Sequence, residues 1–98
     1  MNDLYEFNIP TPMGNIKALV KLFSKNNMLY GYIDTMGKRT EFNNGFISGN
    51  NISISGEIPA KITTIKYNIT GTLENNLLNL CAKTNLGNFN LQGKKIYE

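Results

Sequence analysis

Apolar and polar residues alternate with a period of two along several stretches of the chain. The alternation is clearest over residues 16–22, 52–58, 65–73 and 89–93. Successive side chains of a strand point to opposite faces, so this pattern is typical of antiparallel strands with one buried face and one face in water. No stretch sustains the 3.6-residue period of an amphipathic helix. The pattern therefore predicts an all-β protein.

Turn-forming residues separate these stretches at short intervals. They fall at residues 11–14, 24–27, 36–37, 43–45, 49–51, 58–60, 74–76 and 86–88. Because connections this short join neighbouring strands, each strand should pair with the next. We predict one domain over residues 1–98, built as an antiparallel meander of about eight or nine short strands. The meander should form a closed or nearly closed β-barrel.

The two halves of the chain resemble each other. Ile9-Pro10 recurs as Ile58-Pro59, and residues 25–29 recur loosely as residues 74–78, an offset of roughly half the chain. Chance similarity among asparagine-rich turns is one explanation. A duplicated half-barrel is the other.

One set of residues falls on the inner face by its place in the alternation. Glycine within a strand permits the sharp bends that close a barrel, and small residues also leave room for a ligand. The inward phenols of Tyr5 and Tyr67 each need a hydrogen-bond partner, which a backbone carbonyl or a bound molecule can supply. The candidate ligand-binding residues inside the barrel are Tyr5, Ala18, Gly31, Ile54, Tyr67 and Ala82.

A second set of residues predicts an apolar patch on the outside. If Phe23 and Met28 flank a hairpin at residues 24–27, Lys21 lies across from Tyr30 and Leu19 lies across from Tyr32. Exposed aromatic patches commonly mark interfaces. The candidate interface residues, for a homodimer or another protein, are Leu19, Phe23, Met28, Tyr30 and Tyr32.

The composition removes most catalytic chemistry. The chain has no histidine, so the commonest general base and most zinc sites are absent from it. Its acidic residues are scattered, and no glycine-rich phosphate loop appears. The single cysteine, Cys81, has no basic neighbour that would lower its pKa. We therefore expect no catalytic site, metal or cofactor.

The charge and the cysteine content limit the partners and the cellular compartment that we expect for this protein. The net charge of +3 comes without a basic run, so no nucleic-acid partner is expected. No apolar run is long enough to span a bilayer, so no membrane partner is expected. A single cysteine allows no intramolecular disulfide, and no secretory signal is visible, so the cytoplasm is the expected compartment.

Taken together, the turns resemble those of small bacterial calycin-like barrels. The TPMG turn at residues 11–14, the EFNNG segment at 41–45, the GN turn at 49–50 and the closing LQGK at 91–94 stand in the order found in those proteins. The resemblance implies a shape related to lipocalins and fatty-acid-binding proteins, in a domain that occurs alone or attached to flavin-dependent oxidoreductases. It implies no known activity. Residues 58–61 depart from the pattern because they lack a second TPMG turn, and the chain is shorter than a typical lipocalin.

Two functions follow from these features of the sequence. The first is a non-catalytic binding module for a small apolar ligand held inside the barrel. The alternative is a protein-interaction or homodimerisation module, which includes an accessory domain of an oxidoreductase. A self-contained enzyme would need an acid pair or a Tyr–Arg pair assembled across strands, and no local motif predicts one.

Overall fold

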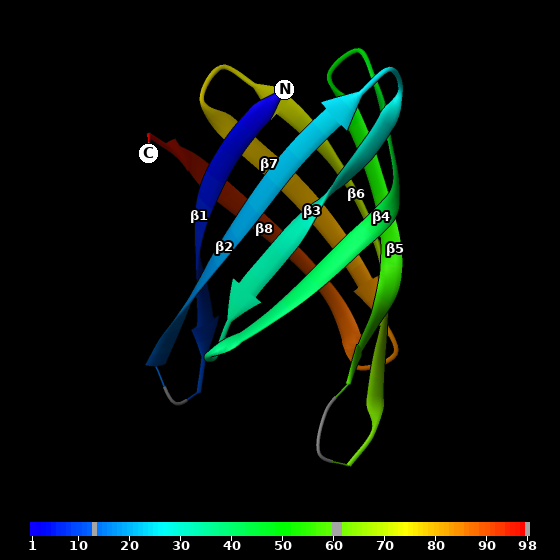
Figure 1. The fold of residues 1–98 in the computed structure, drawn as a ribbon. Coiled ribbons are helices and arrows are strands. Elements are labelled where there is room, and N and C mark those ends of the chain that lie inside the picture. The colour runs from blue at the N-terminus through cyan, green and yellow to red at the C-terminus, as the bar shows by residue number, and fades with distance from the viewer. Residues whose placement is uncertain (13, 60–61, 98) are drawn as a thin grey trace.

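The chain forms a single closed β-barrel (Figure 1). The computed structural model describes residues 1–12, 14–59 and 62–97. The eight strands are β1 (Asn2–Thr11), β2 (Gly14–Lys25), β3 (Met28–Thr35), β4 (Lys38–Ser48), β5 (Asn51–Pro59), β6 (Thr64–Glu74), β7 (Leu77–Thr84) and β8 (Gly87–Ile96). Each strand pairs antiparallel with the next, and β1 pairs with β8 to close the barrel. The all-β class, the meander order and the closure predicted from the alternation are confirmed.

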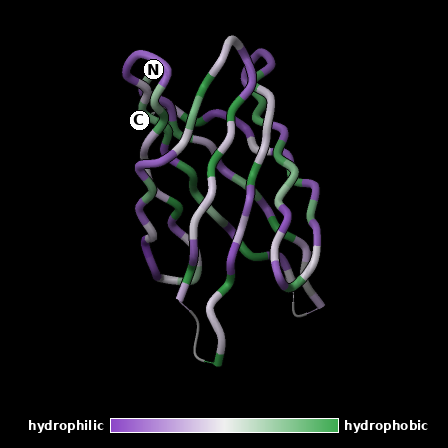
Figure 2. Tube along the Cα trace, turned by 90° about the vertical axis from the view of Figure 1, so that its right-hand side faces the viewer, coloured by the Kyte–Doolittle hydropathy of each residue, from purple (hydrophilic) through white to green (hydrophobic). Residues whose placement is uncertain are grey.

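The barrel has two ends of different character. The hairpins β2–β3, β4–β5 and β6–β7 lie with both chain ends at what we call the packed end. The hairpins β1–β2, β3–β4, β5–β6 and β7–β8 lie at the opposite end, which we call the mouth end. Hydrophobic and hydrophilic positions alternate along the strands that connect the two ends (Figure 2).

Two of the eight strand contacts are short. β1 pairs with β8 only from Leu4 to Glu6, and β4 pairs with β5 only from Phe46 to Ser48. The ladders within β1–β4 and within β5–β8 are longer. The barrel is therefore two four-stranded meanders joined along two short seams.

Strand boundaries and hydrogen bonds of the first meander recur at equivalent positions in the second. Met28 and Thr35, the ends of β3, correspond to Leu77 and Thr84, the ends of β7, each 49 residues later. The same offset relates two backbone hydrogen bonds, from the Ser24 amide to the Met1 carbonyl at 3.2 Å and from the Leu73 amide to the Asn50 carbonyl at 2.7 Å. The sequence similarity between the halves thus coincides with a repeat of the structure.

Large and small inward residues exchange places between the two halves. Phe7 is paired with Ala18 on β1 and β2, whereas at the equivalent pair on β5 and β6 the small residue comes first, Gly56 with Tyr67. Leu22 with Gly31 and Gly71 with Leu80 show the same exchange on the next pair of strands. Each pair contains one bulky side chain and one space for it, which suits the close packing of a protein interior.

The packed end is filled by large apolar side chains. The largest fully buried residues are Phe7, Leu22, Leu29 and Leu78. Fully burying a leucine or phenylalanine side chain stabilises a fold by about 1.5–3 kcal/mol. Three of these four side chains, those of Leu22, Leu29 and Leu78, lie close to the hairpins of this end.

The predicted register of the first long hairpin is wrong by two residues. β2 continues to Lys25, which pairs with Met28 across a two-residue turn of Asn26 and Asn27. Asn26 has φ +59°, a conformation that asparagine tolerates better than most residues and that tight hairpins require. Because β2 continues two residues beyond Phe23 while β3 begins at Met28 as expected, every cross-strand pair of the hairpin is shifted by two residues.

The predicted turn at residues 43–45 is also wrong, and this is why the barrel has eight strands rather than nine. These residues lie within β4, opposite a register shift between Leu29 and Gly31 on β3. A Cβ atom on Gly45 would lie 2.9 Å from the Leu29 carbonyl oxygen and 3.0 Å from that of Ser53. The glycine there allows three strands to approach closely, and it does not form a turn.

Candidate ligand cavity

An apolar cavity of about 170 Å³ lies inside the barrel on the side of the mouth end. Its walls come from every strand except β4. The lining residues are Phe7, Ile9, Ala18, Val20, Ile33, Thr35, Ile58, Ile65, Tyr67, Ile69, Leu80, Ala82, Thr84 and Leu91. The large side chains gather at the packed end, and the cavity is the interior volume that they leave unfilled.

The six interior residues singled out from the sequence are all buried, but they do not share one site. Ala18, Tyr67 and Ala82 line the cavity. Tyr5, Gly31 and Ile54 are not part of its wall. A Cβ atom on Gly31 would overlap the Lys21 carbonyl oxygen and meet the Phe42 ring, so this glycine leaves no room for a ligand.

The interior glycines likewise accommodate neighbouring side chains. The Tyr67 hydroxyl would lie 2.6 Å from a Cβ atom on Gly56, and the Phe7 ring occupies the equivalent space beside Gly93. A choice of residues by small size passes over the isoleucines that form much of the wall, which are Ile9, Ile33, Ile58 and Ile65. The alternation of apolar and polar residues in the sequence would have identified these isoleucines, because it places their side chains inwards near the mouth-end hairpins.

An open pocket adjoins the cavity where β4 and β5 separate beyond their short seam. It has a volume of about 620 Å³, and it shares Thr35, Ile58 and Ile65 with the cavity. Lys38 lies on its wall, and its ammonium group donates a hydrogen bond to the Pro59 carbonyl at 3.3 Å. We call this pocket the mouth. It places one positive charge beside the route from solvent to the apolar interior.

Burial raises the pKa of both inward phenols. Desolvation is the cause for Tyr67. For Tyr5 desolvation is the largest cause, and the nearby Asp3 carboxylate adds to it. Asp3 forms an ion pair with Lys95 at 3.1 Å, which raises the pKa of that lysine. Neither phenol is poised to act as a base near neutral pH.

These shifts predict a loss of stability in alkali. Above the ordinary phenol pKa of 10.0, the unfolded chain loses tyrosine protons that Tyr67 and Tyr5 retain in the folded barrel. The free energy of unfolding should therefore fall as the pH rises above about 10. Urea unfolding from about pH 8 to about pH 11 measures this decline. The Tyr67→Phe variant should show a shallower decline, and Tyr30→Phe, which keeps both buried phenols, should retain it.

The predicted outer patch lies on the outward face of β2 and β3. The rings of Phe23 and Tyr30 stack with centroids 5.3 Å apart and an interplanar angle of 15°. Met28 and Tyr30 are exposed, whereas Leu19, Phe23 and Tyr32 are half-buried. Because of the shifted register, Phe23 faces Tyr30, Lys21 faces Tyr32, and Leu19 faces Asp34. Exposed Phe46, which pairs with Met28 from β4, was not predicted as part of the patch.

A charged cluster borders this patch. The Arg39 guanidinium donates two hydrogen bonds to the Asp34 carboxylate, at 2.9 and 2.7 Å, and lies 3.7 Å from the centroid of the Tyr32 ring. These bonds hold the pKa of Asp34 below its ordinary value. The described residues contain no group of three or more acidic or cysteine side chains that could hold a metal ion. The cluster has the geometry of a surface ion pair.

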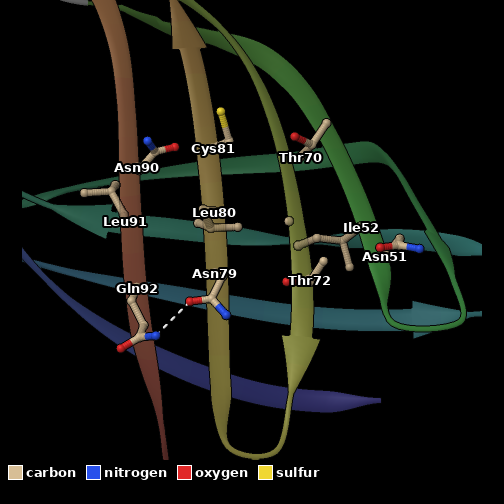
Figure 3. Close-up of a pocket in the computed structure, with 11 residues that line it drawn as sticks. Asn51, Ile52, Thr70, Thr72, Asn79, Leu80, Cys81, Asn90, Leu91 and Gln92 are labelled. Carbon is tan, nitrogen blue, oxygen red and sulfur yellow. Dashed lines mark hydrogen bonds between the residues drawn. The ribbon is translucent and has the colours of Figure 1, made fainter.

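A second concave surface lies on the outside of β5–β8 (Figure 3). Its outward side chains are uncharged amides and hydroxyls together with Cys81, whose thiol is free and half-buried. Gln92 donates a hydrogen bond to the Asn79 side chain at 2.8 Å, across the strands β8 and β7. Since the residues that line this surface include neither an acid nor a base, it offers hydrogen bonds rather than charge.

Comparison with known proteins finds no matching family model, no similar curated protein and no similar solved structure. The class that the fold defines is an eight-stranded antiparallel meander barrel with an apolar cavity near one end.

Proposed function

We propose that the protein is a non-catalytic binding module that holds a small apolar molecule, or the apolar end of a longer one, inside the barrel. The observation that carries this proposal is the cavity of about 170 Å³ with apolar walls, which opens towards the mouth. The resemblance to calycin-like barrels is in accord with it. The single free thiol of Cys81 is in accord with a cytoplasmic setting.

The size of the cavity limits the ligand. A dry apolar cavity of about 150 Å³ in another protein binds benzene or xenon, so the present cavity suits one aromatic ring or a short alkyl chain. Sites for drug-sized molecules usually measure about 300–1,000 Å³. A larger ligand would have to extend into the mouth, where Lys38 can meet a polar or anionic group.

Binding can be tested with benzene and n-hexanol as probes, followed by the methyl resonances of the isoleucines. We expect Ile33, Ile58 and Ile65, which line the cavity, to shift on addition of the probe. Ile52, which is buried outside the cavity wall, provides the internal control. If no cavity methyl responds more than Ile52, the proposal is wrong.

A cavity-filling variant gives the matched test. Ala18→Leu places three more carbon atoms in the cavity and should weaken probe binding at least tenfold. Thr70→Leu places a leucine side chain of the same size on the outer face and should bind like the wild type. Thermal unfolding of both variants shows whether the barrel is intact. Equal binding by Ala18→Leu and the wild type would contradict the assignment of the site.

The alternative function is a protein interface on the outer patch. The exposed side chains of Met28, Tyr30 and Phe46 favour it, since exposed apolar clusters are commonly contact sites. The partner would be a second copy of the chain or an oxidoreductase to which the domain is an accessory. Native mass spectrometry distinguishes the two functions: a dimer that Tyr30→Lys dissociates would support the interface, and a retained small molecule would support the cavity.

A further inference from the structure

The hairpins of the mouth end carry large apolar residues at exposed positions. Met36 in the β3–β4 hairpin is 77% exposed, Ile62 between β5 and β6 is 98% exposed, and Leu86 in the β7–β8 hairpin is 60% exposed. They stand on three separate hairpins around one end of the barrel (Figure 1). Neither the core nor the cavity wall uses these side chains. Polar residues at such tips would be the usual choice for a surface in contact only with water.

Basic residues surround the same end. Among the described residues within three positions of the four mouth-end hairpins, the cations are Lys17, Lys38, Arg39, Lys66 and Lys83, and the carboxylates are Asp34, Glu41 and Glu57. The corresponding segments of the packed end, which also holds both chain ends, contain Lys25, Lys94 and Lys95 with Asp3 and Glu74 among the described residues. The mouth-end segments therefore carry five cations against three carboxylates, a moderate excess of positive charge around the apolar tips.

The spacing of the apolar tips indicates what kind of surface they meet. A rigid protein partner is usually contacted through one continuous, well-packed patch. Three isolated apolar side chains on separate hairpins instead suit a deformable medium into which each can insert on its own. Apolar side chains flanked by lysine and arginine are typical of segments that lie at the surface of an anionic bilayer.

We propose that the mouth end docks reversibly on an anionic membrane surface. Met36, Ile62 and Leu86 insert at the level of the headgroups, and the surrounding lysines meet the lipid phosphates. Docking turns the mouth and the apolar cavity towards the bilayer. The proposal goes beyond the binding function and does not depend on it, because membrane binding requires no ligand in the cavity.

This inference revises the sequence-based expectation of no membrane partner. That expectation concerned segments that cross a bilayer, and no helix among the described residues is long and apolar enough to do so. Surface docking requires only that short apolar and basic segments, far apart in the sequence, meet at one end of the fold.

Co-sedimentation with vesicles tests the proposal with the ligand-free protein. We expect binding to vesicles that mix phosphatidylcholine with phosphatidylglycerol, little binding to phosphatidylcholine alone, and weakening as salt is raised. The triple variant Met36→Ser, Ile62→Ser, Leu86→Ser should bind at least about tenfold more weakly. The variant Lys17→Gln, Lys66→Gln, Lys83→Gln should lose about fivefold per lysine.

The controls use matched residues from the other end of the barrel. Met28→Ser with Phe46→Ser removes two exposed apolar side chains there, and Lys25→Gln removes a packed-end charge. Both variants should bind vesicles like the wild type, and thermal unfolding should show every variant folded.

Absence of wild-type binding to the anionic vesicles at low salt would overturn the proposal. Equal losses in the control variants would overturn the assignment to the mouth end. Benzene binding, measured separately, reports on the cavity.

Discussion

Phe7→Ala is expected to lower the free energy of unfolding by about 3–5 kcal/mol. Phe7 is 1% exposed, and it belongs to the core cluster while also forming part of the cavity wall. Removing its ring would join the space beside Gly93 to the existing cavity. A domain of this size has a total stability of about 5–15 kcal/mol, so the variant should be marginally folded.

Urea unfolding measures this loss, and thermal unfolding should show a midpoint lowered by about 12 °C or more. Phe89→Ala is the matched control, since Phe89 is 47% exposed on β8 and should cost about 1 kcal/mol or less. A loss below about 1 kcal/mol for Phe7→Ala would contradict the position of its ring in the core.

The contact between Phe7 and Gly93 can be tested by a double-mutant cycle. Gly93→Ala alone should be destabilising, because the new methyl group would overlap the Phe7 ring. In combination with Phe7→Leu, the same methyl group meets a smaller side chain. The double variant should therefore be more stable than the sum of the two single changes predicts, by about 0.5–3 kcal/mol.

Gly31→Ala is expected to destabilise the barrel by about 3 kcal/mol or more. The added Cβ atom would overlap the backbone carbonyl oxygen of Lys21 and lie 3.2 Å from the Phe42 ring. A flexible side chain could move aside, but a backbone carbonyl within the β2–β3 ladder cannot do so without breaking strand pairs. The cost should appear both in urea unfolding and as a lowered thermal midpoint.

Gly49→Ala is the matched control for this change. Gly49 lies in the β4–β5 turn with φ +59°, and no atom would lie within 4 Å of an added Cβ. Its cost should be limited to the conformational strain of about 1–2 kcal/mol. If Gly31→Ala proves as mild as Gly49→Ala, the close approach of β2 and β3 at this point is not present in solution.

The strands were predictable because their signal is local. Alternation along residues such as 65–73 requires only that neighbouring side chains point to opposite faces, which any extended chain satisfies. The asparagine and glycine turns also act locally, since residues such as Asn26 and Gly37 adopt the positive φ of a tight turn. The strand order followed, because short connections leave few other partners.

The sequence-based predictions were wrong where the role of a residue depends on its contacts with residues far away in the sequence. Glycine is common in turns, yet Gly45 lies within β4, because Leu29 and Ser53 approach it closely from two other strands. Gly31 and Gly56 could have lined an empty interior, but a backbone carbonyl and the Tyr67 ring occupy their space. The sequence alone does not distinguish a glycine that forms a turn from one that lets two strands approach closely or one that borders a cavity.

The sequence by itself determined the all-β class, the meander and which face of each strand is buried, because each depends on contacts between near neighbours. Only the tertiary structure decided the two short seams, the packed end and the cavity near the mouth. Those features depend on how the volumes of Phe7, Tyr67 and the leucines fit across the barrel. The gathering of Met36, Ile62 and Leu86 at one end was likewise decided only by the fold, since no local pattern brings separate hairpins together.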